Sequence, residues 1–228
     1  MIPECILAET TTRHQARLTL QEHDGSYVIR LNGQALMHSA RTASELLLGE
    51  LAVARLTNPH AGRVLVGGLG LGFSLRSVLA KAASTATVHV AELIPQVVDW
   101  NRQFLTALNG KLVDDPRVRI YTEDLWNVLS RSARNWYDAI LLDIDNGPAA
   151  MVQQPNARLY KLNGIWLLQA ALKPGGRAAI WSAAPDHAFA ERLAWAGFRV
   201  EAIPAKLYAQ AKRFGCTLYV ADKRLKYS

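Results

Sequence analysis

The chain has 228 residues, of which half are hydrophobic and 20% are charged, and its formal net charge is +7. This composition excludes an intrinsically disordered protein, and the length suits one domain, or one domain with a small appendage. No apolar run approaches the roughly 20 residues that a membrane span needs. The N-terminus lacks a basic segment followed by an apolar one, and Cys5 and Cys216 form no metal-binding spacing. We therefore expect a cytoplasmic protein with no metal and no membrane partner.

The basic residues are scattered along the chain, and their densest groups lie at 206–213 and 223–226. A positive chain can bind RNA or another anionic partner. Scattered charge is also what a solvated basic surface produces, and we favour this second interpretation. Nucleic acid therefore stays open as a partner, but it is not the one that we expect.

Residues 1–58 are predicted to form an N-terminal appendage. Apolar residues alternate along 15–31 on either side of Asp24-Gly25, which predicts a β-hairpin, and Asn32-Gly33 predicts a second turn. A hairpin alone is marginally stable. We therefore expect it to pack on the main domain or on a second subunit.

A helix is predicted after the hairpin. Thr42-Ala-Ser-Glu45 has the spacing of a capping box, and an apolar-rich stretch follows as far as Leu56. Asn58-Pro59 ends this helix, so we place the start of the second domain, 59–228, at this point. Capping explains Glu45 about as well as a role in a binding site does.

In residues 59–228, strands and helices alternate, which predicts an α/β fold: a Rossmann-like, seven-stranded and mostly parallel sheet with helices on both faces. The loop 204–215 is too short for a crossover helix, so the last strand is expected to run antiparallel. Pro174 and Gly175 predict a turn within 172–176, before the fifth strand. We expect strands at 63–67, 87–92, 117–121, 137–143, 176–182, 198–203 and 216–221, and helices at about 73–83, 95–108, 125–131, 158–171 and 187–196.

A glycine motif, Gly68-x-Gly70-x-Gly72, lies between the first of these strands and its helix. Glycines let the backbone approach a ligand closely, and the start of a helix presents free N–H groups. The spacing differs from the G-x-G-x-x-G of a dinucleotide site. Glu92 ends the next apolar strand, about 20 residues further on, where a carboxylate would meet a ribose. Together these features predict a site for a nucleoside-type ligand.

Acidic residues follow three successive strands of this sheet: Glu92, Asp124 and Asp143. Ligands of open α/β sheets bind beyond the carboxyl ends of the strands, so these acids are expected to share one pocket with the glycines. Glu92 and Asp124 have a structural alternative, because each could cap the helix that follows it.

Asp143 is the hardest of these acids to explain by structure alone, since it directly follows four apolar residues. Asp143 and Asp145 share a face in an extended chain, where they could hold a cationic substrate and accept a proton from an amine. The alternative is that Asp145-Asn-Gly-Pro148 only forms a turn. The polar segment 149–156 suits a loop that covers the site.

These residues resemble the class I S-adenosylmethionine-dependent transferases, and more narrowly the spermidine synthase-like branch that includes the polyamine aminopropyltransferases. The resemblance implies that Gly68, Gly70 and Gly72 cradle the amino-acid part of S-adenosylmethionine, that Glu92 binds its ribose and Asp124 its adenine. It further implies that Asp143 deprotonates the attacking amine, that Tyr160 follows the active-site loop, and that the hairpin joins a homodimer. The motifs that carry it are Val64-Leu-Val-Gly-Gly, Val90-Ala-Glu-Leu, Asp115-Pro-Arg-Val-Arg, Glu123-Asp124, Tyr137-Asp-Ala-Ile-Leu-Leu-Asp143 and Leu172-Lys-Pro-Gly-Gly176.

Two departures from this branch decide our functional prediction. No acid lies between 67 and 72, where the aminopropyltransferases have one, and Ala43-Ser44-Glu45 replaces their Tyr-His-Glu. Bare backbone N–H groups suit a cofactor that keeps its carboxylate. We therefore expect methyl transfer from S-adenosylmethionine to a small amine-bearing acceptor, which Asp145, Glu45 and Tyr160 would orient. The alternatives are aminopropyl transfer from decarboxylated S-adenosylmethionine to a polyamine, and a non-catalytic nucleoside-binding protein.

Overall fold

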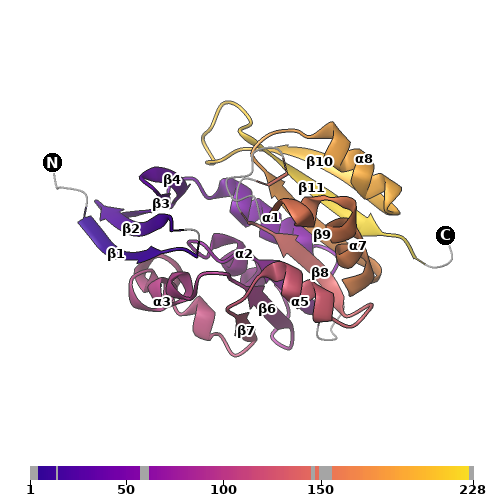
Figure 1. The fold of residues 1–228 in the computed structure, drawn as a ribbon, viewed down its shortest axis with the longest axis horizontal. Helices are drawn as coiled ribbons and strands as arrows, with labels where there is room; N and C mark the ends of the chain where they lie inside the picture. Colours follow the sequence, from indigo (N-terminus) through magenta and orange to yellow (C-terminus); the bar gives the residue numbers. More distant parts are fainter. Residues whose placement is uncertain (1–4, 14, 57–61, 145–146, 149–155, 226–228) are drawn as a thin grey trace.

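The structure is a computed structural model that describes residues 5–13, 15–56, 62–144, 147–148 and 156–225. The predicted domain boundary at 58–59 lies outside these residues. The chain forms two sheets, and Figure 1 shows the small one at the end of the molecule where the chain begins. No helix of the described ranges is both long and apolar enough to cross a membrane.

The small sheet contains the predicted hairpin and two further strands. Its antiparallel order is β1-β2-β3-β4. Asp24 (φ 48°) with Gly25 (φ 74°) and Asn32 (φ 49°) with Gly33 (φ 84°) have positive φ at both turn positions, as a type I′ hairpin turn requires. The sequence analysis missed the first strand. The bounds are β1 (Cys5–Thr11), β2 (Arg17–His23), β3 (Ser26–Leu31) and β4 (Gln34–His38).

The large sheet has seven strands in the order β10-β11-β9-β8-β5-β6-β7. Strands β5 to β9 pair in parallel, whereas β11 runs antiparallel to both β9 and β10. The prediction of a mostly parallel sheet with an antiparallel last strand is therefore confirmed. The bounds are β5 (Arg63–Gly67), β6 (Thr87–Ala91), β7 (Val118–Tyr121), β8 (Tyr137–Leu142), β9 (Leu172–Ser182), β10 (Phe198–Ala205) and β11 (Cys216–Lys223).

Helices cover both faces of this sheet because successive strand residues point to opposite sides. In β5, Val64 and Val66 belong to a core with α1, α2 and α3, and Leu65 belongs to the opposite core with α5, α7 and α8. Leu20 and Ile29 of the small sheet join the first core, so this sheet packs on the main domain. The bounds are α1 (Ala43–Val53), α2 (Phe73–Lys81), α3 (Pro95–Gln103), α4 (Thr106–Asn109), η1 (Leu112–Asp114), α5 (Leu125–Arg131), α6 (Ala157–Tyr160), α7 (Leu162–Ala171) and α8 (His187–Trp195).

Three predicted elements differ in detail. The helix expected at 95–108 is divided into α3 and α4, and the helix expected at 158–171 is broken at Lys161, whose backbone is extended (ψ 165°). The turn expected at 172–176 lies inside β9. Pairing with β8 jumps from Tyr137–Leu172 to Ala139–Arg177, so the residues between loop out of the ladder.

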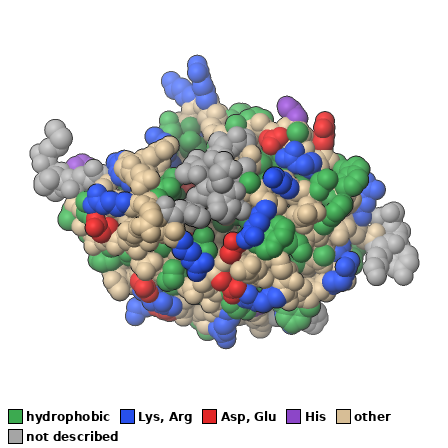
Figure 2. Space-filling model, viewed as in Figure 1, with side chains coloured by type: hydrophobic (Ala, Val, Ile, Leu, Met, Phe, Trp, Pro, Cys, Tyr) green, Lys and Arg blue, Asp and Glu red, His purple; other side chains and the backbone are tan. Residues whose placement is uncertain are grey.

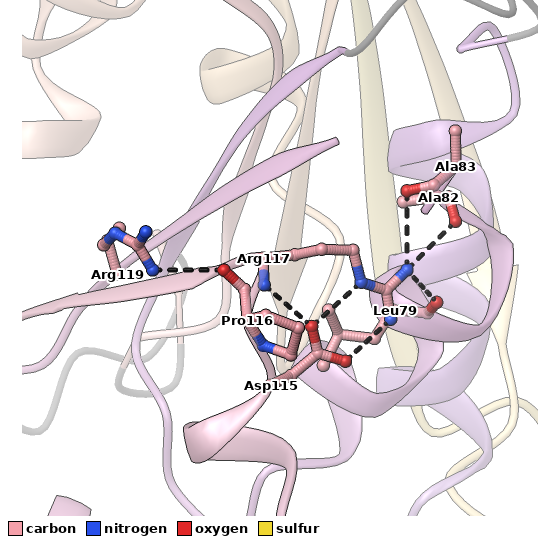
Figure 3. Close-up of polar contacts among 7 residues, drawn as sticks. All are labelled: Leu79, Ala82, Ala83, Asp115, Pro116, Arg117 and Arg119. Carbon is pink, nitrogen blue, oxygen red and sulfur yellow. Dashed lines mark hydrogen bonds and ion pairs between the residues drawn. The ribbon is translucent and has the colours of Figure 1, made fainter. Parts of the chain in front are cut away.

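Arg117 connects the start of β7 to the end of α2 (Figure 3). Its guanidinium pairs with Asp115 at 2.8 Å and donates hydrogen bonds to the carbonyls of Leu79 and Ala82 at 3.0 and 3.1 Å. These carbonyls are the unsatisfied acceptors of a helix C-terminus, which favours a cation. Arg117 thus holds the helix whose other end begins at the glycine motif.

Candidate active site

The glycine loop turns sharply between β5 and α2 and lies directly against the end of β8. Gly68 has φ 89°, and a Cβ atom on it would lie 2.2 Å from the carbonyl oxygen of Asp143. The backbone N–H of Asp143 donates to the Gly67 carbonyl at 2.8 Å. The loop and the first acidic residue after β8 are therefore in contact, and this close approach leaves room only for glycine at position 68.

The small sheet covers the glycine loop at Gly70. A Cβ atom on Gly70 would lie 2.2 Å from Met37 Sδ, on β4. Gly72 lies on the other side of the loop, where a Cβ atom would meet Asn101 Oδ1 at 2.9 Å. Gly72 therefore supports the turn and, contrary to the prediction, does not line the cavity beside the loop.

Glu92 joins the glycine loop to the turn after β6. Its two carboxylate oxygens accept hydrogen bonds from the backbone N–H groups of Leu69 and Ile94, each at 2.9 Å. Burial raises the pKa of this carboxyl group, and the hydrogen bonds from backbone N–H groups oppose the shift. Glu92 thus lines the cavity and also holds the start of α3, so the structural alternative and the site role coincide.

Asp124 caps α5, as the structural alternative predicted, because its side chain accepts from the N–H of Trp126 at 2.8 Å. Its other oxygen accepts from Arg158 at 2.6 Å. Asp124 nevertheless lines the cavity. Arg158 was not identified from the sequence, since a single arginine on a predicted helix gives no signal of its partner.

Asp143 is held by a serine that the sequence analysis missed. Ser74, in the first turn of α2, donates a hydrogen bond from its hydroxyl to Asp143 Oδ2 at 2.5 Å. Burial raises the pKa of Asp143 to about 6, and the bond from Ser74 opposes this shift. Burial thus disfavours the ionised form of Asp143, and the Ser74 hydroxyl partly stabilises that form.

Glu45 does not form the predicted capping box. Thr42 makes no side-chain hydrogen bond to the helix start, and the Glu45 carboxylate accepts instead from the Ser44 hydroxyl at 2.5 Å. Burial and the charge of Asp143 raise the pKa of Glu45 to about 7. Two carboxylates that line one cavity and influence each other's charge can bind an ammonium group or accept a proton from it.

The packing of α1 on α2 brings Glu45 to Asp143. A Cβ atom on Gly49 would lie 2.6 Å from Ser77 Cβ, and the Ser77 hydroxyl donates to the Leu46 carbonyl at 2.5 Å. The two helix backbones therefore approach as closely as glycine permits. This contact joins residues far apart in the sequence, so the sequence could name Glu45 and Asp143 as site residues but not the packing that brings them together.

The cavity brings together six of the predicted site residues and adds an apolar wall. Trp181 on β9 and Ile144 after β8 line one part of it, and neither was identified from the sequence. Side chains of the small sheet line another part: Leu18, Ile29, Leu36 and Met37. The predicted residues that line it are Glu45, Gly68, Gly70, Glu92, Asp124 and Asp143.

Tyr160 is placed differently from the prediction. Its ring is 3% exposed and packs edge-on against Phe189, and its hydroxyl donates to the Ile144 carbonyl at 3.1 Å. Tyr160 therefore supports the segment after β8 from behind and does not line the cavity. Asp145 and most of the segment 149–156 lie outside the described residues. Within the described ranges, no group of three acidic, histidine or cysteine side chains could hold a metal ion.

Comparison with known proteins gives matches to one family. Residues 47–187 match the spermine/spermidine synthase domain. The chain is 29% identical over 177 residues to a spermine synthase of Arabidopsis thaliana, covering 76% of this chain and 46% of that protein. It is 32% identical over 124 residues to a polyamine aminopropyltransferase of Bacillus subtilis, covering 51% of this chain and 44% of that protein. The chain thus spans about half the length of the curated relatives that it matches.

Solved structures resemble the chain in fold. A spermidine synthase from Thermotoga maritima aligns with a TM-score of 0.73 and 20% identity, covering 97% of this chain and 74% of that one. A spermidine synthase in complex with the transition state analogue AdoDATO aligns with a TM-score of 0.75 at the same identity and coverage. At this identity the likeness establishes the fold.

Proposed function

Because the chain belongs to the spermine/spermidine synthase domain family, we propose that it transfers an aminopropyl group from decarboxylated S-adenosylmethionine to an amine. This reverses the order of our sequence-based hypotheses, in which methyl transfer came first. The curated relatives described above are named for spermine synthesis and aminopropyl transfer. These names favour aminopropyl transfer, which was the alternative in our sequence analysis, over methyl transfer.

The observation that carries this proposal is the acid pair of Glu45 and Asp143 beside the glycine loop. Both carboxyl groups line the same cavity as Gly68 and Gly70. An acid within the glycine loop is absent, so in this chain negative charge reaches the loop from α1 and from the end of β8. A pair of carboxylates at this place suits a substrate that carries ammonium groups.

The rest of the cavity fits an adenosyl sulfonium donor. Positions 68 and 70 leave no room for a side chain, so the backbone itself forms the cradle. Glu92 and Asp124 line the part of the cavity that follows β6 and β7, and we assign them to the ribose and the adenine. The donor supplies an activated carbon next to a positive sulfur, which becomes a neutral thioether when the C–S bond breaks.

The side chains at the cavity would then act on the acceptor. Asp143 takes the proton that the amine must lose as its nitrogen forms the new C–N bond, and Ser74 holds the carboxylate oriented. Glu45 attracts the cationic acceptor, and the apolar wall of the small sheet excludes water. Asp145 stays a candidate for binding the acceptor.

Calorimetry with the two donors tests this proposal. We expect decarboxylated S-adenosylmethionine to bind at least about tenfold tighter than S-adenosylmethionine, because the described residues that line the cavity include acids and no lysine or arginine to receive a carboxylate. Mass spectrometry of a diamine incubated with enzyme and donor should show the mass of an added aminopropyl group. Tighter binding of S-adenosylmethionine together with a methylated amine would establish methyl transfer. Tight binding without any transferred group would establish a nucleoside-binding protein.

A further inference from the structure

The loop between β10 and β11, residues 206–215, presents cations and aromatic rings to solvent. Tyr208 is 47% exposed and Phe214 is 65% exposed, and Lys206, Lys212 and Arg213 are exposed beside them. Phenylalanine is among the residues most often fully buried, and tyrosine is usually at least half-buried. The exposed rings of Tyr208 and Phe214 contribute little to the hydrophobic core, and they lie between basic residues. Binding to a partner would explain both features.

The loop is held in shape and is not simply unfolded. The Leu207 carbonyl accepts from the Ala43 N–H at 3.1 Å, and the Gly215 N–H donates to the Ala205 carbonyl at 2.9 Å. Ala211 is 7% exposed and donates to the Tyr208 carbonyl at 3.0 Å. The backbone is therefore anchored at both ends and in the middle, while the aromatic and basic side chains point outward.

Positive charge accumulates around this loop. Neither 202–216 nor the neighbouring segment 34–43 contains an aspartate or glutamate, and Arg41 in the latter is exposed. Burial, followed by the charges of Arg41 and Arg30, lowers the pKa of His38. Figure 2 shows Lys and Arg side chains projecting at the top of the molecule, where Figure 1 places this loop.

The described part of the chain provides no acidic partner for the basic side chains of the loop. Among the described residues, no ion pair involves Lys206, Lys212, Arg213 or Arg41. By contrast, the exposed Arg199 contacts Asp222 at 3.3 Å, within a cluster that shares one carboxylate. The loop therefore offers unpaired cations to a partner.

We propose that the loop 206–215, together with Arg41, is a binding surface for single-stranded nucleic acid. Phe214 and Tyr208 supply faces on which bases stack, and Lys206, Lys212 and Arg213 lie where phosphates would pass between them. An acidic peptide would use the cations but leave both rings without a role. The surface is separate from the aminopropyl chemistry, although Ala43 ties the loop to the helix that carries Glu45.

The scattered charge of the sequence favoured a solvated basic surface, and the structure adds the observation that changes this interpretation. The 206–213 group shares its loop with two exposed rings, and it lies beside a second acid-free segment from the N-terminal part of the chain. Charge alone attracts any polyanion, whereas rings interleaved with charge are what unpaired bases require.

Fluorescence anisotropy with a labelled single-stranded oligo-uridine, measured over a range of salt concentrations, tests this proposal. If the surface makes about four phosphate contacts, a plot of the logarithm of the binding constant against the logarithm of the salt concentration should have a slope of about −3. The double variant Lys212→Ala/Arg213→Ala should weaken binding and reduce the slope by about 1.4. Phe214→Ala should weaken binding about fivefold or more and leave the slope unchanged, because it removes stacking and no charge.

The matched control removes the same charge elsewhere. Lys111 and Arg134 are exposed on other loops, and Lys111→Ala/Arg134→Ala should bind the oligonucleotide as the parent protein does. The proposal is overturned if this control weakens binding as much as Lys212→Ala/Arg213→Ala, or if Phe214→Ala binds normally. Preferred binding of a polyglutamate peptide, or of vesicles rich in phosphatidylserine, would assign the surface to a protein or to a membrane instead. Calorimetry with the donor should be unchanged in all variants, which shows that they are folded.

Discussion

Asp143 is the residue on which the proposed chemistry depends, because it lies where β8 meets the glycine loop and lines the cavity together with a second carboxylate, Glu45. We predict that Asp143→Asn reduces turnover about 100-fold or more, since the variant cannot accept the proton of the amine. Donor affinity should change by less than about threefold, because the amide keeps the size of the side chain and the donor is held by other groups. Single-turnover kinetics and calorimetry measure the two effects.

Asp138 provides the control for this prediction. It lies on the same strand, away from the cavity, and pairs with Lys173 at 2.8 Å. Asp138→Asn should keep its turnover even if the protein becomes less stable. Equal loss of turnover in Asp138→Asn and Asp143→Asn would mean that the strand, not the proton acceptor, had been damaged.

The acid pair also predicts how the reaction depends on pH. Burial raises the pKa of Asp143 to about 6, so the base is protonated and the rate falls as pH decreases through this value. Glu45 has the higher pKa, about 7, so it is mostly neutral where Asp143 loses its proton, and Glu45→Gln should leave this acidic limb near pH 6. Ser74→Ala removes a hydrogen bond to the ionised carboxylate and should move the limb to higher pH. Profiles of kcat/KM against pH measure both variants, and a limb that Ser74→Ala leaves in place or moves to lower pH would contradict the proposed role of this hydrogen bond.

At the scale of elements, the glycine loop packs against a different neighbour at each of two glycines. We therefore expect substitutions at Gly68 and Gly70 to have different effects. At Gly68 the obstacle is the backbone carbonyl of Asp143, which cannot move without breaking the end of β8. At Gly70 it is the end of the flexible Met37 side chain, which can turn away. Close contact with backbone is therefore the stricter constraint.

We predict that Gly68→Ala costs at least about 3 kcal/mol of unfolding free energy and that Gly70→Ala costs about 1 kcal/mol, mainly from its positive φ. Gly70→Ala should push Met37 into the cavity and weaken donor binding, and adding Met37→Ala should restore that binding. Met37→Ala should not rescue Gly68→Ala. Urea unfolding and calorimetry test both statements, and equal costs at the two glycines would show that the loop is not packed as described.

At the scale of the whole molecule, the small sheet has one face on the main core and an edge strand, β1, that carries the half-exposed Ile6. Unpaired edge strands are ready templates for pairing with another chain. Our sequence-based expectation was a homodimer joined through the N-terminal hairpin, and β1 extends that hairpin by one strand. We therefore propose the β1 edge as the dimer contact.

Light scattering in solution tests this prediction. We expect a mass about twice the 25.1 kDa of one chain, and about half of that mass for Ile6→Lys, because a charge on the contact disfavours pairing. Trp195→Lys replaces another exposed apolar side chain, on α8, and should leave the dimer intact. If Trp195→Lys is monomeric and Ile6→Lys is dimeric, the dimer contact lies on α8 and not on β1.

The sequence alone determined the features that depend on local physical chemistry. Apolar runs such as Val64–Val66 predict buried strands, the turn residues Asp24-Gly25 predict a hairpin, and acids after successive strands predict one pocket at the carboxyl edge of the sheet. Parallel topology brings those strand ends together whatever lies between them. Hence the fold, the glycines of the loop and the strand-end acids of the cavity followed from pattern, whereas its apolar wall did not.

The tertiary structure decided what depends on contacts between distant segments. In the sequence, capping and a site role explain Glu45 about equally well, and the close packing of α1 on α2 at Gly49 is what places it near Asp143. The family resemblance implied a site role for Tyr160, yet its ring lies at the end of α6 and packs against Phe189. Capping, cavity lining and core packing use the same residue types, so only the position of neighbouring elements in space distinguishes them.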